Sequence, residues 1–255
     1  MAQLEEYSRR YKFVKMERRN GILQVTLHTD GKELQWGWGP HSELPIAFQD
    51  IANDKENRVV ILTGTGNEFS GPKPVPGPRY QLPVADWERV FAEARGLLQN
   101  MLNIDVPMIA AVNGPARRHS ELPLLCDIVL ASDTACFEDS GHFENGLVPG
   151  DGVNIVYPLL LGLNRARYFL LTGQSIGAVE AKELGLVNEV LPQEELLPRA
   201  WEHAEKLVRH PNLHLKYTRM VLTEDLRRRM QDHLGYSLML EAMANMERAA
   251  APKPG

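Results

Sequence analysis

The first 190 residues alternate short apolar runs with longer segments in which apolar residues recur every three or four positions. The runs at 58–66 and 106–114 are almost wholly apolar, as in strands buried on both faces, whereas 41–54 and 85–104 have the spacing of amphipathic helices. A hairpin is expected at 13–29, because Asn20-Gly21 tolerates the positive φ angles of a tight turn. This alternation predicts an α/β fold with parallel strands in layered β/α units.

Helical patterns dominate the remainder of the chain. Within 163–191, Gly173 is expected to end one helix and Ser175 is a candidate N-cap for a second, which ends near Gly185. Residues 193–210 and 212–250 have the pattern of further amphipathic helices. We therefore expect two regions, a β/α core over 1–190 and a helical C-terminal region over 191–255.

Charge and hydropathy exclude several classes of protein. The 255 residues carry a net charge of −5, with basic and acidic residues interleaved, so no polybasic run favours nucleic acid or anionic lipid as a partner. The first residues lack the apolar stretch of a secretory signal, and no window contains the roughly 18 apolar residues of a membrane span. A cytoplasmic location is the expectation.

The segment HFENGLVPGDG, residues 142–152, places an imidazole and a carboxylate on either side of a turn rich in glycine and proline. Such a turn can bring its two ends together, and a carboxylate bound to one imidazole nitrogen raises the basicity of the other. His142 and Asp151 are therefore candidates for an acid–base pair. Spacing alone equally allows a solvated loop in which the two residues meet by chance.

Two more histidines lie where binding groups are common. His119 follows a predicted strand and precedes a short helix, whose first N–H groups favour negative charge. His41 opens the helix after LQWGWGP, in which Trp36 and Trp38 are a candidate apolar wall. Each histidine could instead serve only as a helix-start residue. No metal-binding motif, nucleotide loop or serine elbow is present in the sequence, so no metal or other cofactor is expected.

Five segments occur in the order and spacing typical of the crotonase (enoyl-CoA hydratase/isomerase) superfamily. They are VVILTGTGNEFSG, VPMIAAVNGPA, CDIVLAS, FENGLVPGDG and RARYFLLTGQSIGAVEAKELGLVNEVLP. The resemblance covers about residues 13–250. It implies a crotonase-like core of layered ββα repeats and a C-terminal helical region that assembles homotrimers, often paired into hexamers.

Two loops depart from the superfamily pattern. Gly71-Pro72-Lys73-Pro74 stands where the family usually has Ala-Gly-Ala-Asp, and residues 117–120 replace a run of glycines. These loops supply the oxyanion-hole N–H groups in the family, so the resemblance implies Lys73 and His119 as donors. The first loop carries Pro72, Pro74, Pro76 and Pro78, which lack N–H groups, and we expect weak or no binding of a CoA thioester.

The polar residues that remain are similar to those of the 6-oxocamphor hydrolase type, the β-diketone hydrolases of the superfamily. By position the resemblance implies a catalytic set of His41, His119, His142, Asp151 and Glu241. Trp36 matches a tryptophan that lines the substrate pocket. The implied reaction is a retro-Claisen cleavage of a small β-diketone to a keto acid, without a cofactor.

In this hypothesis His142 activates water and is oriented by Asp151 or Glu241, while His119 holds a carbonyl with Trp36 or His41. Asp151 is also a candidate to protonate the enolate. Two alternatives stay open at this point. One is an acyl-CoA hydratase or isomerase with an altered site that uses Glu121 and His142, and the other is a non-catalytic scaffold with the same fold.

Overall fold

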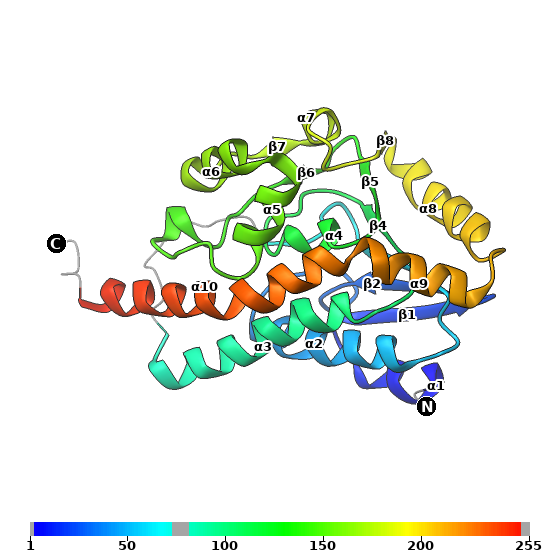
Figure 1. The fold of residues 1–255 in the computed structure, drawn as a ribbon, viewed down its shortest axis with the longest axis horizontal. Coiled ribbons are helices and arrows are strands. Elements are labelled where there is room, and N and C mark those ends of the chain that lie inside the picture. Colours follow the sequence, from blue (N-terminus) through cyan, green and yellow to red (C-terminus); the bar gives the residue numbers. More distant parts are fainter. Residues whose placement is uncertain (1–2, 73–81, 251–255) are drawn as a thin grey trace.

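The computed structural model describes residues 3–72 and 82–250 (Figure 1). The chain begins with α1 (Leu4–Tyr7) and the 3-10 turn η1 (Ser8–Arg10), which lead into the hairpin of β1 (Val14–Arg19) and β2 (Ile22–Leu27). Asn20 and Gly21 have φ angles of 53° and 79°. The hairpin turn therefore uses the two positive φ angles that the Asn-Gly pair predicted.

Within the described residues, six strands form the main sheet in the order β1-β2-β3-β4-β5-β8. The later strands are β3 (Val59–Gly64), β4 (Met108–Val112), β5 (Ile128–Ser132) and β8 (Glu189–Leu191). Only the β1–β2 pair is antiparallel, and every other neighbouring pair in this sheet is parallel. The predicted parallel core is confirmed.

Beyond the ends of the parallel strands, short bridges form a second layer. Ser70 pairs with Ala116, which in turn pairs with Phe137, so the segments after β3, β4 and β5 lie side by side. β6 (Cys136–Phe137) then pairs antiparallel with β7 (Ile176–Gly177). These bridges hold the loops at the strand ends at fixed distances from one another.

Helices cover both faces of the main sheet (Figure 1). Val60 and Leu62 of β3 face a core that includes Leu98, whereas Val59 and Ile61 face a second core that includes Ala200. This period of two is the pattern of a strand buried on both sides. The first core is closed by helices α2 (Trp38–Asn53), α3 (Val84–Leu102), α5 (Val153–Leu161) and α10 (Glu224–Ala250), and the second by α8 (Gln193–Leu207) and α9 (Asn212–Leu222).

Ser175 is not a helix cap, contrary to the sequence prediction. Its hydroxyl donates a hydrogen bond to Glu138 at 3.2 Å, and Gly177 occupies the N-cap position of α7 (Ala178–Glu183). The reason is that Ile176 and Gly177 pair as β7, which delays the helix by one short strand. The stop at Gly173 is correct, because this residue is left-handed, with φ 62°, at the end of α6 (Leu163–Thr172).

The C-terminal helices pack on the core of their own chain. α10 lies alongside α3 and contacts α5, and α8 lies against β3, β4 and β5 (Figure 1). β8 completes the main sheet at the proposed boundary near residue 190, so the assignment of 191–255 to subunit assembly stays a prediction. Among the described helices, none is long and apolar enough to cross a membrane.

Candidate active site

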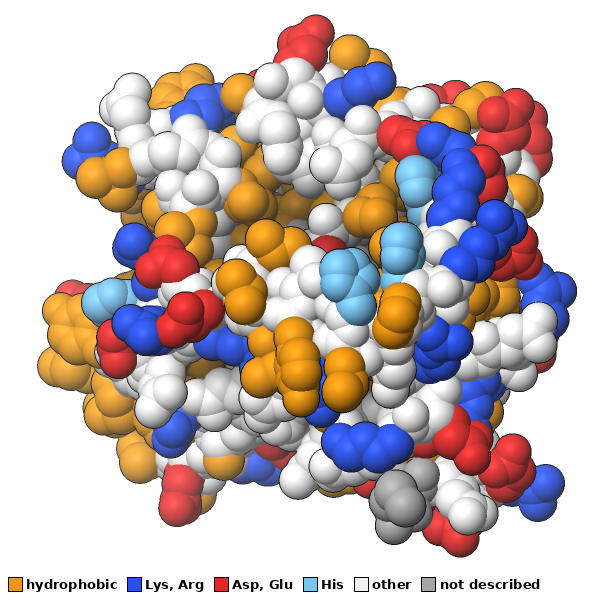
Figure 2. Space-filling model, turned by 45° about the vertical axis from the view of Figure 1, so that its right-hand side comes forward, with side chains coloured by type: hydrophobic (Ala, Val, Ile, Leu, Met, Phe, Trp, Pro, Cys, Tyr) orange, Lys and Arg blue, Asp and Glu red, His pale blue; other side chains and the backbone are white. Residues whose placement is uncertain are grey.

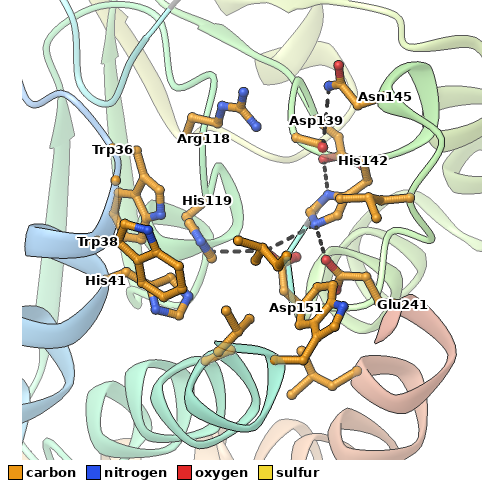
Figure 3. Close-up of a pocket in the computed structure, with 18 of the residues that line it drawn as sticks. Trp36, Trp38, His41, Arg118, His119, Asp139, His142, Asn145, Asp151 and Glu241 are labelled. Atoms are coloured by element: carbon orange, nitrogen blue, oxygen red, sulfur yellow. Dashed lines mark hydrogen bonds and ion pairs between the residues drawn. The ribbon is translucent and has the colours of Figure 1, made fainter. Parts of the chain in front are cut away.

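A cavity of about 550 Å³ lies where the loops after the parallel strands meet α2, α3 and α10. Figure 3 shows two groups of side chains facing each other across it. One group comprises Trp36, Trp38, His41 and His119, and the other comprises Asp139, His142, Asp151 and Glu241. Apolar side chains of α3 and α10 line the floor, including Trp87, Val90, Ala94 and Leu238.

Close backbone contacts bring the strand-end loops together. The Asn113 side chain accepts a hydrogen bond from the Gly64 N–H at 2.9 Å and donates to the Gly66 and Glu68 carbonyls. A Cβ at Gly114 would lie 1.9 Å from the Asn67 carbonyl oxygen, so this position admits only glycine. The loops after β3 and β4 are thereby locked together.

His119 lies on that loop just before α4 (Glu121–Leu124), and its carbonyl accepts a hydrogen bond from the Leu122 N–H at 3.1 Å. Its backbone is left-handed, with φ 49°, a conformation that few non-glycine residues adopt. Its Nδ1 lies 2.8 Å from Glu121 Oε1 and 3.4 Å from Asp151 Oδ2, and its ring stacks on Trp36 at 4.1 Å between centroids. Ring position is thus fixed from three directions.

His142 lies among three carboxyl groups. Its Nδ1 is 2.5 Å from Asp139 Oδ1, while its Nε2 is 3.4 Å from Asp151 Oδ2 and 3.6 Å from Glu241 Oε1. All four side chains are buried. Asp151 and Glu241, the two acids predicted as alternatives to orient His142, both lie near Nε2. Nδ1 is held instead by Asp139, which the sequence analysis did not weigh.

The Gly150-Asp151-Gly152 turn lets α10 deliver Glu241 to this cluster. A Cβ at Gly150 would lie 2.5 Å from the Ser237 carbonyl oxygen and 3.0 Å from Glu241, so a side chain there would push the helix away. The Ser237 hydroxyl instead donates to the Gly150 carbonyl at 2.6 Å. Gly152 has φ 111°, which favours glycine, and it opens α5 directly after Asp151.

His41 lies in the first turn of α2, which begins at Trp38 and not at the histidine itself. Its Nδ1 is 2.7 Å from Glu93 of α3, and its ring is 6.0 Å from that of His119. Burial is the main cause that lowers the pKa of His41, and the neighbouring His119 adds to the effect. The side chain is therefore a neutral imidazole at physiological pH.

Charge divides the carboxyl groups of the cavity into two kinds. Burial alone would raise the pKa of Asp151, but His142 and His119 together hold it well below its usual range, so Asp151 is ionised. Burial raises the pKa of Glu241 to about 8. Burial also raises the pKa of Glu121. Asp151 therefore carries a negative charge near neutral pH, whereas Glu241 carries a proton.

The carboxyl groups of the cavity raise the pKa values of His142 and His119. Burial, the largest effect, lowers the pKa of His142, yet Asp151, Asp139 and Glu241 outweigh it, and the pKa lies well above the ordinary value. The pKa of His119 is also raised, because Glu121 and Asp151 outweigh its burial. Asp151 Oδ2 lies 3.4 Å from a ring nitrogen of His119 and 3.4 Å from one of His142, so its negative charge stabilises the protonated form of both rings.

Several carboxyl oxygens in the cavity wall are buried without a hydrogen-bond partner among the described residues. They are Glu121 Oε2, Asp139 Oδ2, Asp151 Oδ1 and Glu241 Oε2. Unpaired buried oxygens of this kind are rare in folded proteins and mark places where water or a ligand completes the site. Donor atoms of His119, Glu121 and Asp151 lie within 4.8 Å of one another, close enough to ligate a cation. The same spacing is explained without a cation if the His119 Nδ1 proton is shared between Glu121 and Asp151.

The structure brings His41, His119, His142, Asp151, Glu241 and Trp36 to one cavity. Lys73, the other predicted oxyanion donor, lies outside the described residues. Sequence reasoning missed Asp139, Glu93 and Arg118, which also reach the cavity or its histidines. The sequence does indicate Asp139, because a carboxylate three positions before His142 can reach its ring. It does not indicate Glu93, which lies on an ordinary amphipathic helix.

The family model described as enoyl-CoA hydratase/isomerase matches residues 17–249. The chain belongs to this family. A carnitinyl-CoA dehydratase of Shigella flexneri is 34% identical to this chain, over 74% of this chain and 72% of its own length. The crotonase fold predicted from the motif order is thus confirmed, and the protein is a crotonase-family enzyme.

Among solved structures, a β-diketone hydrolase of the cyanobacterium Anabaena, bound to (S)-3-oxocyclohexyl acetic acid, superposes with a TM-score of 0.89. It is 43% identical, with 95% of this chain and 97% of that chain covered. An enoyl-CoA hydratase/isomerase of Mycobacterium paratuberculosis has a TM-score of 0.82 and 27% identity, over 92% and 94% of the two chains. The predicted closeness to the β-diketone hydrolases of the family is confirmed.

Proposed function

We propose that this crotonase-family enzyme hydrolyses a carbon–carbon bond of a β-diketone by a retro-Claisen reaction, without CoA. The observation that carries the proposal is the setting of His142. Asp139 holds one ring nitrogen, and the other faces a cavity whose opposite wall presents a second imidazole and two tryptophans. This arrangement separates a group that can take a proton from groups that can hold a carbonyl.

In the first step a water molecule at His142 attacks one carbonyl of the diketone. The Asp139 carboxylate accepts a hydrogen bond from the Nδ1–H group, which leaves Nε2 as the atom that takes a proton from water. Asp151 lies 3.4 Å from Nε2 and stabilises the imidazolium that forms. General-base catalysis of this kind typically contributes about 10²–10⁴-fold in rate.

In the second step the carbon–carbon bond breaks and the other carbonyl becomes an enolate. His119, whose raised pKa makes it a proton donor, faces that oxygen from the Trp36 side, and neutral His41 lies behind it. The proton taken from water rests on the His142–Asp151 pair and returns from there to the enolate carbon. In this scheme Glu241 stays protonated throughout and donates a hydrogen bond to the substrate.

The ligand of the Anabaena hydrolase indicates a substrate class. Removing one water from 3-oxocyclohexyl acetic acid, so that the carboxyl carbon joins the ring carbon beside the ketone and across from the side chain, gives a bicyclic 1,3-diketone. Such a compact, neutral molecule suits a cavity of about 550 Å³ with apolar walls. We therefore propose bicyclic β-diketones as the first substrates to test.

The test is a mass-spectrometric assay of the purified protein with cyclic, bicyclic and linear β-diketones, and with crotonyl-CoA in parallel. The proposal predicts a keto acid that is heavier than the diketone by one water. His142→Ala should lose about 10²-fold or more of this activity, whereas His233→Ala, an exposed histidine of α10, should retain it.

Each other result has a definite meaning. Reaction of crotonyl-CoA alone would establish the hydratase alternative, in which Glu121 and His142 act on a thioester. His142→Ala with more than about half of the wild-type rate would contradict the assignment of the base. Turnover of any diketone excludes the scaffold alternative.

A further inference from the structure

One cation faces the cavity and has no role in the reaction described above. Arg118 lies on the loop between β4 and α4, directly before His119, and its half-buried side chain lines the cavity. Figure 3 shows its guanidinium between His119 and Asp139, on the cavity side of the loop. The Ser70 hydroxyl donates a hydrogen bond to the Arg118 carbonyl at 2.6 Å, which fixes the backbone from which the side chain extends.

The adjacent arginine shows how unusual this setting is. Arg117 is paired with Glu138 at 2.7 Å and lies 3.6 Å from Glu68. The Arg118 guanidinium makes no hydrogen bond or ion pair with any residue in 3–72 or 82–250. Burial lowers the pKa of Arg118, and Asp139 and Asp151 oppose the effect from a distance. A partly desolvated guanidinium without a partner is unfavourable unless a ligand supplies the anion.

A glycine makes room for the Arg118 guanidinium. A Cβ at Gly141 would lie 2.9 Å from Arg118 Nη1, closer than such atoms approach in proteins. The guanidinium therefore lies close against this residue, and Arg118 lines the cavity. Gly141 has no positive φ angle, so alanine fits its backbone and would displace only the flexible end of Arg118.

We propose that Arg118 is a carboxylate-binding residue, which makes this cavity a site for keto-acid anions. The planar fork of a guanidinium matches the two oxygens of a carboxylate, and the pair forms charge-assisted hydrogen bonds. The inference rests on the proposed function in one respect, since retro-Claisen hydrolysis converts a carbonyl carbon into a carboxylate within this cavity. Arg118 would receive that group while the enolate is held at His119.

The carboxylate could come from two sources. It is either the group formed by hydrolysis or a group that the diketone already carries. The first source predicts that Arg118 affects product inhibition and leaves the KM of a neutral diketone nearly unchanged. The second predicts that Arg118 affects the KM of a diketone that bears a carboxylate, with the neutral diketone a poor substrate.

The experiment is calorimetric titration of the protein with the carboxylate of (3-oxocyclohexyl)acetic acid and, separately, with the primary amide of this acid. We expect the acid to bind about tenfold or more tightly than the amide. Arg118→Gln should abolish this preference, Arg118→Lys should keep part of it, and Gly141→Ala should weaken it with the charge intact. Arg117→Gln is the matched control and should leave the preference unchanged.

The two ligands separate the failure of this inference from that of the proposed function. Equal affinity for acid and amide in the wild type, or an acid preference that survives in Arg118→Gln, would overturn the role of Arg118 even if diketones are hydrolysed. Conversely, an acid preference that depends on Arg118 supports the role even if no diketone reacts. Product inhibition and KM, measured for the neutral and carboxylate-bearing diketones, then identify the source of the carboxylate.

Discussion

The acid–base behaviour of His142 is set by the carboxyl groups around its ring. Burial favours the neutral imidazole, but Asp151, Asp139 and Glu241 raise its pKa well above the ordinary value. The free enzyme therefore gains its base form as the pH rises, and kcat/KM should increase with pH over a range that lies above the ordinary pKa of an imidazole. At pH values below this ascending limb of the pH–rate profile, the His142 ring is an imidazolium and cannot accept a proton from water.

Asp139→Asn tests this account. The substitution removes one charge that raises the pKa of His142, so the ascending limb of kcat/KM should move to lower pH. The plateau should fall by on the order of 10²-fold, because asparagine no longer fixes the ring tautomer. A pH–rate profile measures both effects, with Asp133→Asn, an exposed aspartate, as the control. An unchanged midpoint would show that Asp139 does not act on the base.

Asp151 and Glu241 should respond differently to loss of charge. Asp151 is ionised, so Asp151→Asn removes a charge that balances two imidazoles, and kcat should fall by about 10²-fold or more. Glu241 has a pKa of about 8, so Glu241→Gln resembles the form present at pH 7 and should cost about tenfold or less. Steady-state measurement of kcat at pH 7 for both variants and the wild type compares the two losses. An equal loss in both variants would make Glu241 the acid that protonates the enolate.

Residue identity was predictable where a turn and a family pattern agreed. His142, Asp151 and His119 follow from the glycine-rich turn and from their positions at strand ends, and the structure places them around one cavity. Asp139 and Arg118 were not predicted, because a lone aspartate or arginine in a loop is usually solvated. Their burial depends on the short bridges of the second layer, which leave no periodic signal in the sequence.

At the scale of elements, Arg219 anchors α9 to the core. Its side chain is 1% exposed, and it donates to Asp127 at 2.7 Å and to the carbonyls of Leu102, Ile104 and Leu125. Asp127 in turn accepts a hydrogen bond from the Met108 N–H, at the start of β4. The Arg219 guanidinium therefore ties α9 to the start of β4 and to the segments around Leu102 and Leu125, in addition to the apolar contacts of Leu215.

Arg219→Met should lower the free energy of unfolding by about 1–3 kcal/mol, because the carbonyls of Leu102, Ile104 and Leu125 and the partly exposed Asp127 carboxylate lose their donor. Arg228→Met removes the exposed pair with Glu224 and should change it by less than about 0.5 kcal/mol. Denaturant titrations of both variants give the comparison. Similar losses would show that the buried cluster does not stabilise α9.

Helices and strands were predictable because their apolar periods are long enough to read. The runs at 58–66 and 106–114 became β3 and β4, and the Asn20-Gly21 turn formed as expected. The error at Ser175 has a local cause, since a serine before a helical pattern also suits a two-residue strand that pairs with a distant partner. That partner, β6, is itself too short to be recognised from sequence.

At the scale of the whole molecule, charge is spread and not concentrated. Figure 2 shows basic and acidic side chains beside one another along the right-hand side of this face, which agrees with the interleaving in the sequence. Assembly into trimers, and the use of 191–255 for that purpose, remain predictions from the family resemblance. Glu241 reaches the cavity from α10, the C-terminal helix.

The central claim is that water is added across a carbon–carbon bond, and the most direct test is turnover of a bicyclic β-diketone in ¹⁸O-labelled water. We predict a keto acid with one heavy oxygen in its new carboxylate and one solvent hydrogen at the former bridging carbon, formed as a single enantiomer. The contrary result is an unreacted diketone together with a heavy hydroxyl group on the product from crotonyl-CoA, which would make the protein a hydratase.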